Sequence, residues 1–231
     1  MLLAGLVPDW ARPVFHYIIE TGLPFTLKIA AFAVVGTVVI GIALGTLLTI
    51  RFLPLRAPIR LYIEVWRGLP LIVTLFLIVY ALPQTTFHVT FQPWVGAAIG
   101  LTLWGSAQVA EATRGAVESI PREQHEAAAA LGFGWLGRHV FVVLPQAGRR
   151  LLPPLVSLMA NVIQNTTLAS LVGVTDILFA AKQQVERLAA PPPAGQLEQH
   201  GFAIYGAVLV FFFVISFPLT RLAAYLERRL V

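Results

Sequence analysis

The stretch LPFTLKIAAFAVVGTVVIGIALGTLLTI, residues 23–50, carries a single charged side chain, Lys28, close to its start. A helix needs about 20 predominantly apolar residues to cross a hydrocarbon core roughly 30 Å thick, and this stretch meets that requirement. The whole chain is similarly apolar, since 58% of its 231 residues are hydrophobic, 12% are charged and its mean hydropathy is +0.80. Soluble domains carry about a quarter charged residues. The sequence therefore predicts an integral membrane protein.

Further apolar segments can be separated along the chain, at residues 61–82, 93–118, 151–175 and 202–220. The uncharged run 68–110 is too long for one span, and Pro83 and Pro93 interrupt it. We therefore expect two helices there, joined by a short polar turn. Taken together, the segments predict an all-α integral membrane protein with about five transmembrane helices in a single domain over residues 1–231.

The positions of lysine and arginine predict the orientation in the membrane. Cytoplasmic connections carry an excess of these residues. The connections after the first and third spans and the C-terminal tail are rich in arginine, whereas the second connection, residues 83–92, has neither lysine nor arginine. We therefore expect the N-terminus outside and the C-terminus in the cytoplasm. The arginines that support this orientation are Arg51, Arg56, Arg60, Arg122, Arg138, Arg149, Arg150, Arg221, Arg228 and Arg229.

The same distribution explains the sequence pI of about 10.1. The basic residues lie at span ends and form no continuous patch, so we expect membrane lipid and no nucleic acid as a partner. No basic leader precedes an apolar run at the N-terminus, where Asp9 comes before Arg12, and we expect no cleaved signal peptide. The outer segment 189–199 contains three consecutive prolines and is predicted to be an exposed loop.

The third connection, IPREQHEAAAALGFGWLGRHVFVVLPQAGRR (residues 120–150), is more structured than a plain loop. Residues 126–131 are rich in alanine and favour a helix, and Gly132 follows, where a helix can end. Large apolar side chains come next, and Pro145 is expected to stop the second helical piece. The pattern predicts a short helix-turn-helix at the inner membrane face that either receives another protein or only packs on the bilayer as an amphipathic helix.

EAAAALG, followed at a distance by LP, resembles the EAA loop of binding-protein-dependent ABC permeases. In that family the loop forms a coupling helix that docks in a groove of a cytoplasmic ATPase. The resemblance implies this coupling role for Glu126, Ala127, Ala128, Gly132, Leu144 and Pro145.

Four other segments also resemble the polar amino-acid uptake branch of this family, which carries histidine, glutamine, glutamate, arginine or opines. They are EVWRGLPLIVTLFLIVYALP (64–83), AEATRGAVESIPREQHEAAAALG (110–132), NTTLASLVGVTDIL (165–178) and RLAAYLERRL (221–230). The resemblance implies the type I ABC importer permease fold, with a cytoplasmic coupling helix at about residues 120–150. It also implies an ATP-driven importer of polar amino acids. The same machinery importing another small polar solute, such as an opine or a sulfur-containing amino acid, is the alternative.

The chain contains no G-x-x-x-x-G-K-[ST] loop, so we expect ATP and Mg to be bound by a partner and no cofactor by this chain. The resemblance implies as partners a cytoplasmic ABC ATPase dimer, a second permease subunit (identical or homologous) and an extracytoplasmic solute-binding protein. It places the assembly in the bacterial cytoplasmic (inner) membrane.

Placing an ionisable side chain near an apolar span costs free energy unless the side chain is paired, so each such residue is a functional candidate. Glu64 and Arg67 are three residues apart, as are Glu111 and Arg114, so each pair shares a helix face and can form an ion pair. Either the pairs are structural, or members of them contact the α-carboxylate or α-amine of a substrate. Both readings stay open at this point.

Gln164, Asn165 and Thr166 form a polar, uncharged cluster at the end of the fourth span. The cluster would suit a zwitterionic ligand, or it forms hydrogen bonds between helices in the bilayer. The family that this chain resembles usually has Lys-Asp at the positions of Gln164 and Asn165. This chain therefore lacks both charges at these positions.

The sequence argues against a membrane enzyme. Serines occur within the spans, but no span offers a histidine or paired carboxylates suited to activate them, and we expect no catalytic residue. The histidines show no metal-ligand spacing, so we expect no metal site; they are His16, His88, His125, His139 and His200. A purely structural membrane scaffold is the remaining alternative.

Overall fold

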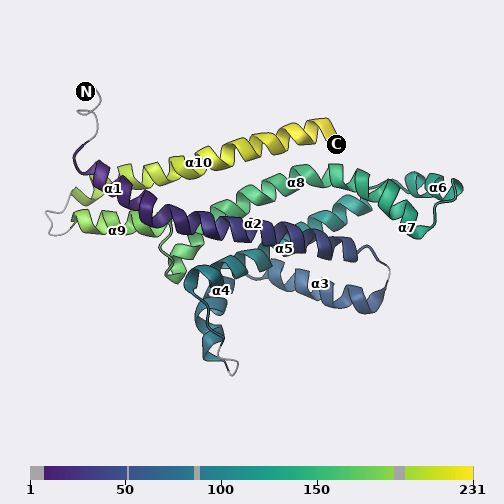
Figure 1. The fold of residues 1–231 in the computed structure, drawn as a ribbon, viewed down its shortest axis with the longest axis horizontal. Helices are drawn as coiled ribbons and strands as arrows, with labels where there is room; N and C mark the ends of the chain where they lie inside the picture. The colour runs from purple at the N-terminus through teal and green to yellow at the C-terminus, as the bar shows by residue number, and fades with distance from the viewer. Residues whose placement is uncertain (1–7, 51, 86–88, 190–195, 231) are drawn as a thin grey trace. The chain divides into compact units, whose positions relative to one another are not determined.

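The computed structural model describes residues 8–50, 52–85, 89–189 and 196–230, and these residues form helices, turns and short extended links, with no β-strand among them. Predictions that concern Arg51, His88 and residues 190–195 lie outside the described residues. In chain order the helical elements (Figure 1) are α1 (Ala11–Tyr17), η1 (Ile18–Gly22), α2 (Leu23–Leu47), α3 (Leu53–Gly68), α4 (Leu71–Phe76), η2 (Leu77–Ala81), η3 (Leu82–Gln84), α5 (Pro93–Glu118), α6 (Arg122–Ala130), α7 (Trp135–Arg138), η4 (His139–Val143), α8 (Leu144–Asn165), η5 (Thr166–Val172), α9 (Ile177–Ala189) and α10 (Gln196–Leu230).

Long apolar helices confirm that the chain is an all-α membrane protein. In the part of the chain that is described, three helical stretches are long and apolar enough to cross a membrane: Ala11–Leu47, Trp135–Val172 and His200–Leu230. A fourth span results if Leu53–Gly68 and Leu71–Gln84 act together. Helix α5 has 26 residues, about 39 Å at 1.5 Å per residue, but its second half carries Glu111, Arg114 and Glu118 and is therefore less apolar. The exact division into five spans remains a prediction.

Pro145 does not stop a helix, and the prediction that it does is wrong. The π-helical turn η4 joins α7 to α8, and the N–H of Leu144 donates to the carbonyl of His139. Pro145 is thus the second residue of α8. The π turn places hydrogen bonds between residues five apart instead of four, and the helical stretch Trp135–Val172 continues through Pro145.

The proline-rich segment predicted to be an exposed outer loop is shorter than expected. Ala189 is the last residue of α9, and residues 196–199 are already helical in α10. The prediction of a loop over the whole of 189–199 is therefore wrong at both ends, because the three consecutive prolines restrict only their own neighbourhood.

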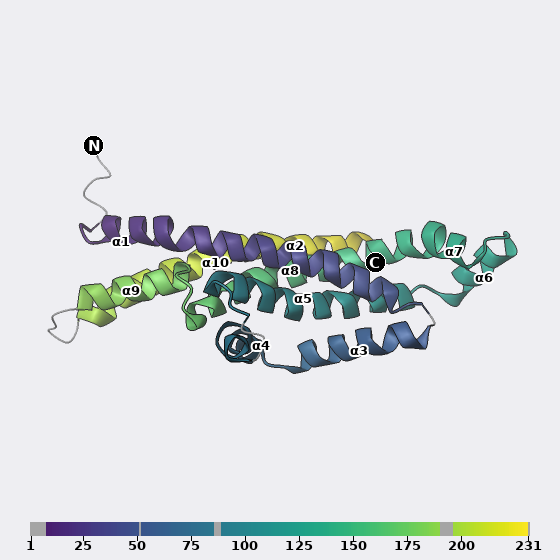
Figure 2. The same cartoon turned by 60° about the horizontal axis from the view of Figure 1, so that its bottom comes forward.

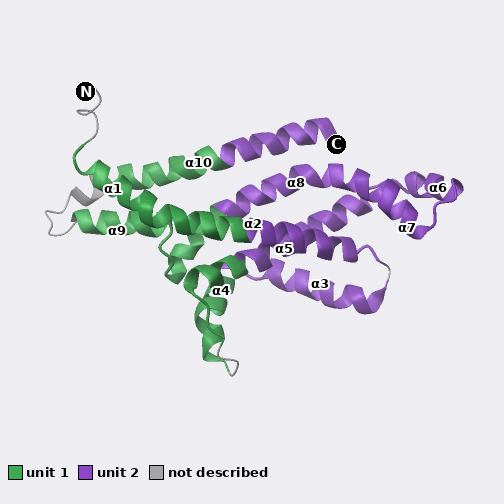
Figure 3. Cartoon of the chain, viewed as in Figure 1, with its two compact units in different colours: residues 1–32, 72–100, 164–215 green, residues 33–71, 101–163, 216–231 purple. Residues whose placement is uncertain are grey.

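The chain divides into two compact units, each described here by itself (Figure 3). Unit 1 comprises residues 1–32, 72–100 and 164–215, and unit 2 comprises residues 33–71, 101–163 and 216–231. The core of unit 1 joins α1 and η1 to α9 and to the first part of α10. Its buried side chains are Val14, Ile18, Ile177, Ala180, Ala181, Val185, Ile204 and Val208.

Asp176 organises the start of α9 within unit 1. Its Oδ1 accepts a hydrogen bond of 2.8 Å from the N–H of Phe179, as the residue preceding a helix commonly does. The N–H of Ile177 donates to Thr26 Oγ1 at 3.0 Å, and Thr26 in turn donates to the carbonyl of Gly22. These bonds fix α9 against the junction of η1 and α2.

Unit 2 is held together by the close approach of α2 and α5. A Cβ atom added to Gly41 would lie 2.9 Å from the carbonyl oxygen of Ser106, so only glycine lets the two backbones pack at this distance. Small residues at helix crossings serve the same purpose in other membrane proteins. On α3, Tyr62 forms a hydrogen bond of 2.7 Å with the Ser106 hydroxyl, which joins α3 to α5.

Candidate functional site

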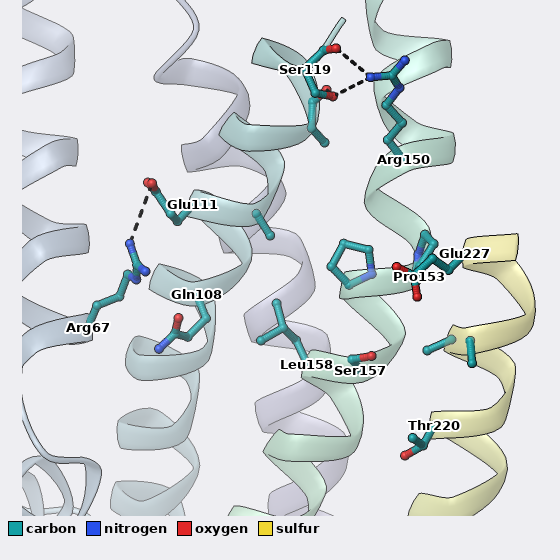
Figure 4. A pocket seen from close by; sticks show the side chains of 15 residues that line it. Arg67, Gln108, Glu111, Ser119, Arg150, Pro153, Ser157, Leu158, Thr220 and Glu227 are labelled. Atoms are coloured by element: carbon teal, nitrogen blue, oxygen red, sulfur yellow. Dashed lines mark hydrogen bonds and ion pairs between the residues drawn. The ribbon is translucent and has the colours of Figure 1, made fainter. Parts of the chain in front are cut away.

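Unit 2 contains a large cavity with charged side chains in its wall (Figure 4). Its volume is about 940 Å³, and residues of α3, α5, α8 and α10 line it. The polar and charged lining residues are Arg67, Gln108, Glu111, Ser119, Arg150, Ser157, Thr220 and Glu227. The remaining wall consists of alanines, Leu158 and the prolines Pro153 and Pro154 of α8.

Glu111 is the centre of an ion-pair chain along α5. Its Oε1 accepts from Arg114 Nη2 at 2.5 Å and its Oε2 from Arg114 Nε at 3.1 Å, so the pair is bidentate. Arg114 also donates to Glu118. From α3, Arg67 Nη1 lies 3.8 Å from Glu111 Oε1, which is an ion pair but beyond hydrogen-bonding distance. Arg114 therefore neutralises Glu111, and Arg67 is held only loosely.

The other charged lining residues come from α8 and α10. Arg150 Nη1 donates to the carbonyl and the hydroxyl of Ser119, at 2.6 and 3.1 Å, which joins the start of α8 to the end of α5. Glu227, on the last turns of α10, forms no ion pair or hydrogen bond with any of the described residues. Its carboxylate and the Arg67 guanidinium are the weakly engaged charges of the cavity.

The structure treats the two predicted pairs differently. Glu111 and Arg114 pair as their spacing predicts. Glu64 instead pairs with Arg60, at 2.8 Å on an exposed face of α3, and Arg67 reaches across to Glu111. Glu64 is also absent from the cavity wall, whereas Arg67 and Glu111 belong to it.

The predicted polar cluster is part of unit 1, not of the unit that contains the cavity. Gln164 and Asn165 end α8, where Gln164 is exposed and Asn165 is half-buried. Thr166 begins η5 and is fully buried. The carbonyl of Gln164 accepts a hydrogen bond of 2.8 Å from Thr167, so part of the cluster closes its own helical turn.

The segment between α5 and α8 forms the predicted helix-turn-helix. Gly132 has φ +82°, a left-handed conformation that favours glycine. The N–H of Gly132 donates to the carbonyl of Ala129, and that of Phe133 to the carbonyl of Ala128, which closes the end of α6. In Figures 1 and 2, α6 and α7 lie side by side. The turn at Gly132 is therefore confirmed, and α6 begins at Arg122, before the expected Glu126.

The residues of the EAA-like pattern are not equally exposed. Ala128 is buried, Leu144 is half-buried, and the remainder lie on the surface: Glu126, Ala127, Gly132 and Pro145. Around them are exposed apolar side chains, among which Leu131 is 78% and Phe141 is 70% exposed. An exposed apolar group of this kind needs a partner surface or lipid.

A histidine pair that the sequence did not single out joins α6 to the following turns. The ring centroids of His125 and His139 are 6.1 Å apart, and the ring centroids of Trp135 and His139 are 4.3 Å apart. Arg138 donates to the carbonyl of His125 at 3.3 Å. Burial, Arg138 and His139 together hold the pKa of His125 below its usual value. Within the described ranges, no group of three or more acidic, histidine or cysteine residues could hold a metal ion.

Residues 15–231 match the family described as binding-protein-dependent transport system inner membrane component. The chain belongs to this family. Members of the family are non-enzymatic membrane subunits of transporters.

Curated relatives of this family member include amino-acid permeases. The glutamine transport system permease protein GlnP of Escherichia coli K12 is 32% identical over 224 residues, covering 96% of this chain and 97% of GlnP. The inner membrane amino-acid ABC transporter permease protein YhdY of the same strain is 32% identical over 209 residues. That match covers 90% of this chain but only 55% of YhdY, so the chain spans about half the length of that relative.

Solved structures confirm the fold of this ABC importer permease. The crystal structure of an amino acid ABC transporter with histidines has a TM-score of 0.80 and 26% identity, and the match covers 96% of this chain and 99% of that one. The MetNI methionine ABC transporter in an inward-facing conformation has a TM-score of 0.73 at 17% identity, which supports the fold alone. The predicted type I importer permease fold is therefore confirmed.

Sequence reasoning missed Arg150 and Glu227 as lining residues of the cavity. From the sequence, Arg150 supports only the predicted orientation in the membrane, and Glu227 is not singled out. One signal was present for Glu227, since it is an acidic residue within an otherwise basic tail.

Proposed function

We propose that the chain is the permease subunit of an ATP-driven, binding-protein-dependent importer of polar amino acids. Family membership supports the importer, and relatives named for glutamine, together with a solved amino acid transporter, support the substrate class. The observation that carries the proposal is the cavity of unit 2, because its wall presents charges of both signs. Such a wall suits the carboxylate and ammonium groups that every amino acid carries.

The segment from α6 to the start of α8 is proposed to couple the permease to an ATPase. Its exposed apolar side chains and the glycine turn support this role. A cytoplasmic ABC ATPase dimer would bind ATP and Mg and dock on this segment. The proposed docking residues are Glu126, Ala127, Ala128, Gly132, Leu144 and Pro145.

The orientation follows from the basic residues at the span ends. The N-terminus would lie outside and the C-terminus in the cytoplasm, in a bacterial inner membrane. A second permease subunit, identical or homologous, would complete the pathway in a single permease domain with about five spans. An extracytoplasmic solute-binding protein would deliver the amino acid to the outer face.

The substrate pathway is proposed to include Arg67, Glu111 and Arg114 of unit 2. We include in the same proposed pathway Glu64 of α3, which lies outside the cavity wall. The proposed pathway also includes three residues of unit 1: Gln164, Asn165 and Thr166. Import of a sulfur-containing amino acid by the same machinery is the second candidate. It is supported by the L-cystine transport system permease protein TcyB of Bacillus subtilis, 29% identical over 231 residues.

The proposal is tested by reconstituting the chain with its ATPase and its binding protein in proteoliposomes and measuring ATP hydrolysis. We expect the amino-acid-loaded binding protein to stimulate hydrolysis in the wild type. Gly132→Asp should insert normally but lose the ATPase subunit on co-purification, because bulk and charge at the turn would oppose docking. Gly148→Asp, on the exposed surface of α8, is the matched control. Hydrolysis that no amino acid changes would overturn the proposal.

A further inference from the structure

Asp176 is one of only two aspartates in the chain, and its carboxyl group is enclosed within unit 1. The residue is 0% exposed. Its Oδ1 accepts the N–H of Phe179, whereas Oδ2 is buried and has no hydrogen-bond partner among the described residues. A buried polar atom without a partner is uncommon and calls for a physical explanation.

The surroundings of this carboxyl group are closely packed. A Cβ atom added to Gly22 would lie 2.8 Å from the carbonyl oxygen of Asp176 and 2.8 Å from Ile177 Cα. The backbone of η1 therefore lies directly against the start of α9. Ile177 and Ala180 are buried in the apolar core of unit 1. This packing keeps bulk water away from Asp176, so hydration does not compensate a charge on Oδ2.

Neighbouring charges do not compensate it either, because no basic side chain in the described ranges forms an ion pair with Asp176. Titratable groups occur on α1, η1, α2, α9 and α10, which surround the start of α9. His16 pairs with Glu20 at 3.2 Å. Lys182 pairs with Glu186 at 3.8 Å. The other described ones are exposed or contact other side chains: Arg12, Tyr17, Lys28, Arg187, His200 and Tyr205.

These surroundings favour the neutral acid over the carboxylate. An ionised Asp176 would bury a charge that has no counter-charge and one oxygen without a donor, which costs far more than burying a neutral group. Asp176 lies beyond the helical stretch that ends at Val172, and burial raises the pKa of its carboxyl group to about 7. The neutral form keeps the hydrogen bond from Phe179, because a carbonyl oxygen also accepts.

We propose that Asp176 is a proton-binding site of unit 1: the bound proton holds the start of α9 against η1 and α2, and its loss loosens this contact. The contact in question is made at Gly22 and through the hydrogen bond from Ile177 to Thr26. In the proposed orientation α9 lies on the outer side, between the last two spans, so the site would exchange protons with the outer solution.

The direction of the pH dependence follows from the pKa of Asp176. It is higher in the packed state than the ordinary aspartate value of about 3.9, so protonation favours the packed state. This stabilisation is complete below the ordinary value and is lost as the pH rises to about 7. Protection of α9 amides should therefore fall by up to about tenfold per pH unit between about pH 5 and 7, and level off above that.

The protonation state can be measured directly in the purified full chain, labelled with ¹³C at the aspartate carboxyl carbon and held in phospholipid nanodiscs. The chain should give two resonances, and Asp9→Asn leaves only that of Asp176. We expect this resonance to shift between about pH 5 and 8.5 with a midpoint near 7. A resonance that stays at the ionised or at the protonated position over this whole range would overturn the proposal.

Hydrogen exchange, corrected for the intrinsic pH dependence of amide exchange, measures the consequence for α9. Asp176→Asn keeps an oxygen that accepts from Phe179 but cannot ionise, so its α9 protection should lose the wild-type pH dependence. Asp9→Asn is the matched control, because it removes the same charge at an exposed position and should keep that dependence. A pH dependence that persists in Asp176→Asn, or is absent from the wild type, would overturn the proposal. If Asp176→Asn does not fold, the carboxyl titration in Asp9→Asn still decides.

Discussion

Replacing Glu111 by alanine should destabilise the permease measurably, because it breaks the ion-pair chain of α5 at its centre. Removing one partner of a buried ion pair costs about 3–5 kcal/mol. The Glu111 and Arg114 side chains are 22% and 21% exposed, and Arg114 keeps Glu118 as a second partner. Both facts reduce the loss, and we expect about 2 kcal/mol for Glu111→Ala.

Glu64→Ala is the matched control, because it removes a carboxylate from an ion pair that is largely exposed. The side chain of Glu64 is 63% exposed, and an exposed pair four residues apart on a helix contributes about 0.3–0.5 kcal/mol. For a chain of this size, 1 kcal/mol shifts the unfolding midpoint by about 2–4 °C.

The assay is thermal unfolding of the two purified variants in the same detergent, followed by size-exclusion chromatography or intrinsic fluorescence. Glu111→Ala should lower the midpoint by about 4–8 °C and Glu64→Ala by about 2 °C or less. Equal shifts for the two variants would refute the reasoning, since they would mean that Arg114 and Arg67 do not depend on Glu111.

Two further predictions concern the segment between α5 and α8. Gly132→Val should weaken ATPase co-purification, because a left-handed conformation costs a residue with a Cβ about 1–2 kcal/mol; Gly134→Val, at φ −65°, should not, and equal effects would count against a role for the turn. Because the pKa of His125 is lowered in the folded segment, the packing of α6 on α7 should be complete above the ordinary histidine pKa of about 6.5 and weaken as the pH falls below it. Hydrogen exchange of α6 amides from pH 7.5 to 5 should show this weakening, and His125→Gln should remove it; an unchanged pH dependence in that variant would contradict the assignment.

The sequence was most informative where physics acts locally. Apolar runs predicted the membrane class, and a glycine after an alanine-rich helix predicted the left-handed turn at Gly132. The spacing of Glu111 and Arg114 predicted their ion pair. Each of these features depends on residues only a few positions apart, so no tertiary information was needed.

Where a charged side chain has two possible ion-pair partners, the sequence does not predict which partner it takes. Glu64 lies four residues from Arg60 and three from Arg67, and both spacings allow a pair on one helix. Arg67 instead turns to Glu111 on another helix, which only the packing of α3 on α5 decides. The cavity positions of Arg150 and Glu227 depend in the same way on how helices pack within unit 2.

Pro145 illustrates a different limit. The rule that proline ends a helix applies to a regular α-helix interior. Here Pro145 directly follows the wider π turn of η4, and the helical stretch Trp135–Val172 continues through it without ending. A single sequence gives no direct signal of such a turn.

The central claim is that the chain forms the membrane pathway of an amino-acid importer. Uptake of radiolabelled glutamine into proteoliposomes that hold this chain, its ATPase and its binding protein tests it most directly. We predict accumulation that requires ATP, the binding protein and the intact chain together, and that falls about tenfold or more in Arg67→Gln. Glutamine entry at the same rate without ATP, or in liposomes that lack this chain, would contradict the account.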